Sequence, residues 1–589
     1  MISKQSRQCP EYEQVDLSVL VIGAGAAGAR AGIALAEHGV DDVLVIGKRA
    51  HGDAHTKWAR GGVNAALGTH DPEDSPAIHA ADTLKEGHFL NDPEKVETVA
   101  RDSPKRIREL DDWGMAFSRT TDGEIDQRYF GAQSFRRTAF AGDHTGESML
   151  ETLVERAREL GVPHRQNVMI TKLLSDGSRV HGALGYDMDD STFLLFNAGA
   201  VILAAGGYTA VYDRHSSRDD ENTGDGLSLA YEAGAELADV EFVQFHPTGM
   251  VGERYEGWDG RLVTEAVRGE GGQLYNANGE RFMKRYSPEQ MELDARDVVA
   301  RAIDAEIAAG RGTENGGVYL DISHRERSFI KERLPRMYER FADLGVDMAE
   351  QPVEVAPTAH YGMGGVVTNS VGKSRLDGLY AIGETMAGVH GANRLGGNSL
   401  AETVVFGKRA GEAVAERVDD SGNMPAPLVT DVAERHFAEL AALAETDGTH
   451  TPAAVFARLR DILERYAGIR RDGESLATGL EQLSNLRRKT ADIAVGGVPS
   501  RSFETAMNLG FAFLAAEAIM RGALERTESR GAHYRRDCPE MNEEWQQNIT
   551  YRASSNGRMR LTRVPIGEPS PAVQRALDAD YELDYHQLE

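Results

Sequence analysis

Cysteine is almost absent from this chain. Its 589 residues include two cysteines, Cys9 and Cys538, near opposite ends. Two distant cysteines form no disulfide framework and are too few for a zinc site or an iron–sulfur cluster, so we expect a reducing compartment and no metal site. No stretch approaches the roughly 18 apolar residues of a transmembrane helix, and the N-terminus carries no signal sequence. We therefore expect a cytoplasmic protein without direct membrane insertion.

Positive charge is also scarce. Lys and Arg together number 65 against 93 Asp and Glu, which gives a formal net charge of −28. An acidic surface repels phosphate backbones, so we expect no nucleic-acid partner, and a small anionic substrate would need a local cluster of cations. Lysine supplies only 12 of the basic residues, a composition that fits a salt-adapted or high-GC source.

The overall composition is that of a packed globular protein, with 41% hydrophobic and 27% charged residues. At the N-terminus, the apolar run Leu17–Ile22 ends in Gly23, and an Ala-rich helix is predicted over Ala26–His38. The run Val43–Ile46 then predicts a second strand, which completes a βαβ unit. Asp92-Pro93 and Ser103-Pro104 each predict the start of a helix, because proline is favoured at the first helical position.

The pattern of predicted helices and strands changes along the chain. Polar helices and short strands suggest an insertion, after which the strand-glycine-helix texture returns and is followed by helices with 3.6-residue periodicity. We predict an α/β protein with a Rossmann-like FAD-binding domain, an inserted α+β capping domain and a C-terminal helical bundle domain. The expected limits are 1–250 and 355–420 for the first, 251–354 for the insertion, 428–530 for the bundle, and 531–589 for an irregular C-terminal segment.

Gly23, Gly25 and Gly28 form the pattern G-x-G-x-x-G between the first strand and its helix. Such a turn lets backbone N–H groups and the helix N-terminus approach a pyrophosphate, although the pattern alone also fits a tight turn without a ligand. NAD binding calls for an acidic residue about twenty positions further on. The second strand ends instead at Ile46-Gly47-Lys48, which favours FAD.

Several later blocks resemble the flavoprotein subunits of succinate dehydrogenase and fumarate reductase. The segment GDAHTKWARGG at 52–62 is similar to the H-T-x-x-A-x-G-G motif of that family. Further blocks match in order: FHPTG at 245–249, TEAVRGEGG at 264–272, NGERFM at 278–283, ARDVVAR at 295–301, HYGMGG at 360–365, HGANRLGGNSLAETVVFG at 390–407 and SRGAHYRRD at 529–537. The resemblance covers residues 15–550.

The resemblance implies that FAD is bonded covalently to His55, which raises the flavin potential in the family. An ordinary hydrogen-bonded loop histidine is the alternative for an isolated residue. The helix that begins near Ser399 would direct its positive end at the flavin, although helix capping or turn closure are local alternatives there. The implied FAD-binding residues are Gly23, Gly25, Gly28, Lys48, His55, Thr56, Gly61, Gly62, Asp225, Glu384, Ser399 and Leu400.

The same resemblance implies that His246, Thr264, His360 and Arg394 bind the carboxylates of succinate or fumarate. Arginine provides a bidentate fork, while histidine and threonine supply directional donors. A surface salt bridge is the alternative for Arg394.

The proton donor and acceptor implied by the resemblance is Arg296, with Glu265 and Arg268 as a relay to solvent. From the local pattern alone, Arg296 and Asp297 would lie on the solvated face of an amphipathic helix. An arginine has a free pKa above about 12, so it can act as an acid only in a desolvated, cation-rich site.

The resemblance thus implies interconversion of succinate and fumarate by hydride transfer to or from FAD. Electrons would pass to an iron–sulfur subunit, and a membrane-anchor subunit would hold the chain peripherally on the inner face of the cell membrane. A soluble L-aspartate oxidase is the enzyme alternative, and it typically lacks the motif histidine. A noncatalytic flavin electron carrier is the third interpretation.

Three departures from the family pattern affect the site. Arg60 stands where the family usually has glutamine, and Val267 stands where some members have cysteine. The segment between His246 and Thr264 carries extra residues, so its loop geometry is expected to differ.

Overall fold

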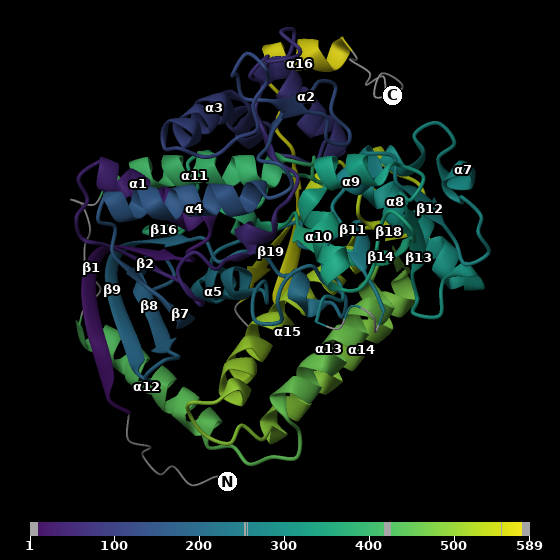
Figure 1. The fold of residues 1–589 in the computed structure, drawn as a ribbon. Coiled ribbons are helices and arrows are strands. Elements are labelled where there is room, and N and C mark those ends of the chain that lie inside the picture. Colours follow the sequence, from purple (N-terminus) through teal and green to yellow (C-terminus); the bar gives the residue numbers. More distant parts are fainter. Residues whose placement is uncertain (1–9, 253–254, 256, 418–425, 555–556, 580–589) are drawn as a thin grey trace.

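The computed structural model describes residues 10–252, 255, 257–417, 426–554 and 557–579 (Figure 1). Cys9 and most of the predicted boundary at 420–428 lie outside these residues. The central sheet is built around β1 (Tyr12–Ile22), whose side chains alternate between two hydrophobic clusters. Val19 and Val21 enter one cluster and Leu20 and Ile22 enter the other, so both faces of the strand need cover.

The strands next to β1 are parallel to it. β1 pairs with β2 (Val43–Ile46) and β9 (Phe193–Leu203), and β16 (Leu379–Ala381) pairs in parallel with the end of β9. Segments on both sides of the predicted insertion therefore share one sheet. Its path is β6-β2-β1-β9-β8-β7, completed by β6 (His164–Arg165), β7 (Val168–Ser175) and β8 (Val180–Asp187).

Helices cover both faces of this sheet (Figure 1). On the face of Val19 and Val21 lie α1 (Ala26–Glu37) and α11 (Asn398–Ala415). On the other face, α5 (Asp225–Ala233) and α15 (Arg501–Glu525) supply apolar side chains. Helix α4 (Thr145–Glu159) packs against α1, and α2 (Pro76–Glu86) packs against α3 (Pro93–Asp112).

A second sheet combines two strands of the inserted segment, β13 and β12, with the strands at its two boundaries, in the order β11-β14-β13-β12. Its buried apolar residues, from Met250 to Val355, form a cluster of their own. Helix α8 (Arg296–Glu306) packs against β11 (Val243–Met250) and β14 (Val353–Gly362). The other elements are α6 (Ala266–Gly269), β12 (Gln273–Tyr275), α7 (Met283–Tyr286), β13 (Val318–Asp321), α9 (Arg327–Arg333) and α10 (Pro335–Asp343).

Three further helices precede α15: α12 (Ala426–Ala444), α13 (Pro452–Ala467) and α14 (Gly473–Lys489). Thr451, Asp472 and Ser500 cap α13, α14 and α15 by accepting hydrogen bonds from first-turn N–H groups. Among the described residues, α15 alone has the length and apolar composition of a membrane span, and 72% of its most apolar window is buried inside the protein. The domain limits stay a prediction.

Two predictions about local structure are wrong. The C-terminal segment is not irregular: it contains the hairpin β19 (Gln547–Ala553) and β20 (Met559–Pro565), followed by α16 (Pro571–Asp578). β19 pairs with β10 (Leu237–Ala238), about three hundred residues earlier, so its strand character depends on a long-range partner.

The second error concerns Ser103-Pro104, where no helix begins. Pro104 lies inside the continuous helix α3. Ser103 and Pro104 are both buried in this helix. The Oγ of Ser103 donates to the carbonyl of Val99 at 2.5 Å. The remaining short strands are β3 (Val63–Asn64), β4 (Gln127–Arg128), β5 (Thr138–Ala139), β15 (Gly365–Val366), β17 (Arg470–Arg471) and β18 (Tyr534–Arg535).

Candidate active site

The glycine turn after β1 leaves one of its three glycines open to the pocket. A Cβ on Gly23 would meet Ala204 O at 2.0 Å, and one on Gly28 would meet Gly23 O at 1.8 Å. A Cβ on Gly25 would first meet Thr56 Oγ1 at 3.3 Å. Gly23 and Gly28 are therefore required for packing of the turn itself, while Gly25 leaves room for a ligand.

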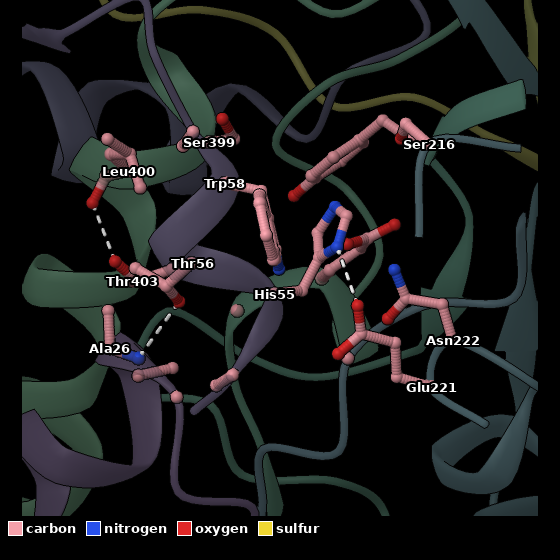
Figure 2. Close-up of a pocket in the computed structure, with 18 of the residues that line it drawn as sticks. Ala26, His55, Thr56, Trp58, Ser216, Glu221, Asn222, Ser399, Leu400 and Thr403 are labelled. Carbon is pink, nitrogen blue, oxygen red and sulfur yellow. Dashed lines mark hydrogen bonds and ion pairs between the residues drawn. The ribbon is translucent and has the colours of Figure 1, made fainter. Parts of the chain in front are cut away.

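Three helices begin at this pocket with a glycine as the N-cap residue. The caps are Gly25 for α1, Gly224 for α5 and Gly397 for α11, and none offers a side chain to the first-turn N–H groups. Thr56 Oγ1 accepts a hydrogen bond from Ala26 N at 3.2 Å (Figure 2). The first-turn N–H groups that remain without a capping side chain attract anions, so this geometry suits a pyrophosphate and the electron-rich edge of a flavin.

Lys48, at the end of β2, lies against a carboxylate from α5. Its Nζ lies 2.8 Å from Asp225 Oδ2 and 2.6 Å from Asn508 Oδ1 of α15. The acid that the end of β2 lacks is thus supplied from elsewhere in the chain. This pair provides both a cation and hydrogen-bond acceptors at one end of the pocket.

His55 lies in the short 3-10 helix His55–Trp58 and contacts an acid that the sequence analysis missed. Its Nδ1 lies 3.3 Å from Glu221 Oε1 (Figure 2). Burial raises the pKa of Glu221, but the hydrogen bond with His55 and the cation of Arg218 outweigh it and lower the pKa to about 2. The carboxylate is therefore ionised and only accepts, so the His55 Nδ1 carries a proton.

The segment between His246 and Thr264 brings Trp258 against the loop of His55. The rings of Trp258 and Trp58 meet edge to face with centroids 6.4 Å apart. Arg340 lies 3.8 Å from the Trp258 ring centre, and Arg261 lies 5.0 Å from that of Trp58. The inserted segment thereby supplies aromatic and cationic groups to the same pocket.

Arg296 is the first residue of α8 and lies inside the protein. It and Asp297 are each 8% exposed, so the solvated-face interpretation is wrong for both. The reason is that the N-terminus of α8 docks onto the pocket, where Arg296 Nε donates to Glu265 Oε2 at 2.9 Å. The Arg296 guanidinium also lies 5.5 Å from the ring centre of Phe130.

Glu265 lies between two arginines. Arg268 Nη2 is 3.7 Å from the same oxygen that Arg296 approaches, and Arg268 Nη1 donates to the carbonyl of Glu292. Burial raises the pKa of Glu265, but the charges of Arg296 and Arg268 outweigh it and lower the pKa. Arg268 does not line the pocket, so these side chains lead away from it in the order Arg296, Glu265, Arg268.

Gln244 joins Arg296 to Arg394, and sequence reasoning missed it. Its Oε1 accepts from Arg296 Nη1 at 3.1 Å and from Arg394 Nη2 at 2.9 Å. Arg394 is buried and also donates from Nη1 to Ser399 Oγ at 2.9 Å, so it is not a surface cation. Burial, and then the charge of Arg296, lowers the pKa of Arg394 to about 10. The two-residue spacing from His246 on a strand was the available signal for Gln244.

Two histidines lie close to these arginines, with ring centroids 5.6 Å apart. Burial and nearby arginine cations hold the pKa values of His246 and His360 well below their usual range, so both rings are neutral at pH 7. Thr248 N donates to His246 Nδ1 at 3.2 Å, which leaves the proton of that ring on Nε2. Thr264 is buried beside them and lines the same pocket.

One pocket holds most of the residues predicted for the site. Gly28 and Arg268 lie outside its lining, and the other predicted cofactor, substrate and proton-transfer residues all lie within it. Glu384 and Leu400 belong to the lining, and burial raises the pKa of Glu384 to about 7. Residues spread over most of the sequence thus surround a single cavity.

Comparisons with known proteins agree with this geometry. Residues 18–400 match the FAD binding domain family, and residues 456–575 match the fumarate reductase flavoprotein C-terminal family. A relative from Methanothermobacter marburgensis, named as a subunit of fumarate reductase (CoM/CoB), is 44% identical over 542 residues, which cover 92% of this chain and 97% of the relative. The chain belongs to the succinate dehydrogenase and fumarate reductase flavoprotein family.

Solved structures of other family members superimpose over almost the whole chain. A variant of E. coli quinol fumarate reductase FrdA is 33% identical, with a TM-score of 0.88, and the match covers 95% of this chain and 99% of FrdA. Mycobacterium smegmatis Sdh1 in complex with UQ1 is 39% identical with a TM-score of 0.84, over 95% of this chain and 96% of the other. The predicted α/β fold class, the family and the FAD-dependent oxidoreductase class are confirmed.

The residues present fit FAD on structural grounds as well. The open side of Gly25 and the glycine-capped helices suit the pyrophosphate and the flavin. Within the described part of the chain, Trp58 Nε1 and Arg394 Nε are buried donors without a hydrogen-bond partner, and both residues line the pocket. Such donors call for acceptors from a bound molecule.

Proposed function

We propose that this flavoprotein interconverts succinate and fumarate in the pocket between the FAD-binding segments and the inserted segment. The observation that carries the proposal is the convergence of Arg296, Arg394, His246 and His360 around Gln244 and Glu265. Two buried cations and two neutral ring donors match a small dicarboxylate on a chain whose net charge is −28. Thr264 adds a hydroxyl donor to the same wall.

Arg394 and His246 would hold the substrate carboxylates. The Arg394 guanidinium is fixed by Ser399 and Gln244 and has a buried Nε without a partner among the described residues. His246 offers Nε2–H because its Nδ1 is occupied by the N–H of Thr248. These contacts would orient the central carbon–carbon bond and exclude water from it.

Arg296 would move the proton. Its Nε and Nη1 are held by Glu265 and Gln244, which leaves Nη2 for the substrate. The Arg296 guanidinium is buried and shares Gln244 Oε1 with the second cation, Arg394. Glu265 and Arg268 would then supply a new proton to Arg296 from the side that faces away from the pocket. FAD, when bound, supplies the two-electron acceptor and donor for the carbon–carbon bond.

FAD would be held by Gly23, Gly25 and the α1 N-terminus at its pyrophosphate and by Ser399, Leu400 and the α11 N-terminus at its flavin. We propose that His55 bonds to it covalently, since His55 lines the same pocket within the H-T-x-x-A-x-G-G motif. Lys48, Asp225 and Glu384 would contact its other polar groups, and Gly61, Gly62 and Thr56 would shape the wall beside it.

Electrons would leave through an iron–sulfur protein, because the two cysteines of this chain are too few to ligate a cluster. We propose that this iron–sulfur partner, together with a membrane-anchor protein, holds the chain peripherally at the inner face of the cell membrane. Solved family members that resemble the chain include a quinol–fumarate reductase with menaquinol molecules.

The proposal is tested by dye-linked turnover of the purified, FAD-loaded chain. Fumarate should be reduced by a dye donor and succinate oxidised by a dye acceptor, without partner subunits. L-aspartate serves as the control substrate and should give no turnover. Oxidation of L-aspartate without succinate oxidation would overturn the proposal in favour of an L-aspartate oxidase.

A further inference from the structure

Glu221 is a largely buried acid whose contact with His55 is not explained by substrate binding or proton transfer. It lies in the loop before α5, and its side chain is 10% exposed. The carboxylate faces the imidazole, with Oε1 3.3 Å from Nδ1, at the edge of the pocket proposed to bind FAD (Figure 2). A buried ionised carboxylate is costly unless it is fully paired, so the arrangement around it indicates its role.

Arg218 fixes Glu221 and the loop of His55 at the same time. The backbone N of Arg218 donates to Glu221 Oε1 at 3.0 Å, and its Nη2 donates to Oε2 at 3.2 Å. Nη1 of the same guanidinium donates to Asp53, at 2.8 Å and 3.0 Å from its two carboxylate oxygens. Asp53 precedes His55 by two residues. Arg218 therefore fixes Glu221 and the loop of His55 relative to each other.

The consequence for the imidazole is a fixed tautomer. Because the carboxylate accepts and cannot donate, the neutral ring keeps its proton on Nδ1 and its lone pair on Nε2. A carboxylate behind a histidine also makes the opposite nitrogen more basic, as it does for histidines that bind metals. The nitrogen not held by Glu221 is therefore the nucleophilic one.

We propose that Glu221 is a positioning residue for covalent attachment of the flavin: it orients His55 and presents Nε2 as the nucleophile. The inference rests on the proposed covalent bond to His55. It assigns a role to a residue that lies outside the H-T-x-x-A-x-G-G motif and contacts the motif only in three dimensions.

Covalent attachment would reduce the flavin ring by two electrons. A bond forms between His55 Nε2 and a methyl carbon of the isoalloxazine, and one C–H bond of that methyl group breaks. The methyl group and the imidazole each give up one proton, while the ring system takes up the two electrons of the broken bond together with two protons. A two-electron acceptor, fumarate or dioxygen, then reoxidises the flavin. While the N–C bond forms the imidazole becomes a cation, and the Glu221 carboxylate stabilises that charge.

The test measures covalent incorporation when flavin-free protein is mixed with FAD. Samples are taken over time, denatured and separated by electrophoresis, and flavin fluorescence is read on the protein band. In Glu221→Leu the rate should fall on the order of tenfold or more, because both orientation and charge are lost. Glu221→Gln keeps an acceptor but not the charge, so its rate should lie between those of Glu221→Leu and the unchanged chain.

Asp219→Asn is the matched control. This substitution removes the carboxylate of a histidine–acid pair that does not include His55. In that pair, Asp219 Oδ1 lies 3.4 Å from His215 Nε2. Its incorporation rate should be unchanged. Noncovalent FAD content and the thermal unfolding midpoint are measured on every variant, and for Glu221→Gln both should match the unchanged chain.

Three outcomes would overturn the inference. Equal incorporation rates in Glu221→Gln, Glu221→Leu and the unchanged chain would remove any role for the acid. A fall in noncovalent FAD binding that accounts for the whole loss in Glu221→Gln would make the role structural. If the unchanged chain carries no covalent flavin, the covalent bond and this inference both fail, whereas succinate and fumarate turnover still tests the rest of the proposed function.

Discussion

Glu265 Oε2 lies 2.9 Å from Nε of Arg296, and both residues line the pocket. This ion pair fixes the plane of the guanidinium. Gln244 holds Nη1 at 3.1 Å, so the orientation of the remaining nitrogen is determined from two sides. Substitutions at these residues and at His55 should therefore have separable effects on turnover, cofactor binding and flavin potential.

Arg296→Ala should abolish proton transfer while the protein still folds. Loss of the group should lower fumarate reduction on the order of 10³-fold, or about 4 kcal/mol of transition-state stabilisation. Arg296→Lys should not restore it, because a compact ammonium cannot meet Glu265, Gln244 and substrate at once. Dye-linked fumarate reduction measures the effect, and FAD content should stay near that of the unchanged chain.

Arg301→Ala controls for the loss of an arginine from the same helix. Arg301 is 29% exposed and contacts Asp297 and the carbonyl of Gly531. We expect turnover within about threefold of the unchanged chain for this partly exposed position. An Arg296→Ala enzyme that keeps more than about a tenth of its turnover, a deficit under roughly 1.4 kcal/mol, would contradict the assignment.

Gln244→Leu should raise KM and lower kcat together. The substitution removes the oxygen shared by Arg296 and Arg394, so two like charges lose their common acceptor. We expect kcat/KM for fumarate to fall on the order of 10²-fold, because a small displacement of a catalytic group lowers the rate even when the group is present. Unchanged kinetics in a folded, FAD-loaded Gln244→Leu protein would show that the arginines are oriented without it.

His246→Gln should retain much of the activity that His246→Ala loses. The pKa of His246 is held well below its ordinary value by burial and arginine cations, so the ring donates a hydrogen bond as a neutral group. Its protonation would begin only well below pH 6.5, and glutamine is also a neutral donor. Profiles of kcat/KM against pH between about 6 and 8 should have the same shape in His246→Gln and in the unchanged chain. An ionisation near pH 6.5 that disappears in the variant would refute the neutral role.

His55→Ser should still bind FAD through the glycine turn but carry no covalent flavin. The proposed covalent bond would raise the flavin potential, so its loss should reduce succinate oxidation more than fumarate reduction. Fluorescence of the denatured protein band and dye-linked assays in both directions measure the two effects. Equal losses of succinate oxidation and fumarate reduction would mean that the covalent bond has a role other than raising the flavin potential.

Local sequence patterns predicted features that depend on neighbouring residues, whereas contacts between distant residues were predicted only through the family resemblance or were missed. The strand, glycine turn and helix around Gly23 are local, and all three are present. Arg296 was predicted on a helix, but its burial depends on how α8 packs on β11, which periodicity does not encode. Glu221 lies in an irregular loop, and only the fold brings it to His55, whose position is 166 residues away.

An anaerobic titration of the flavin distinguishes succinate from L-aspartate as the substrate. Purified FAD-loaded protein is titrated with succinate while the visible absorbance of the oxidised flavin is followed, and fumarate is then added. We expect succinate to bleach the flavin and fumarate to restore its absorbance, and both changes should be lost in Arg296→Ala. Bleaching by L-aspartate, with no change on addition of succinate, would exclude succinate as the substrate.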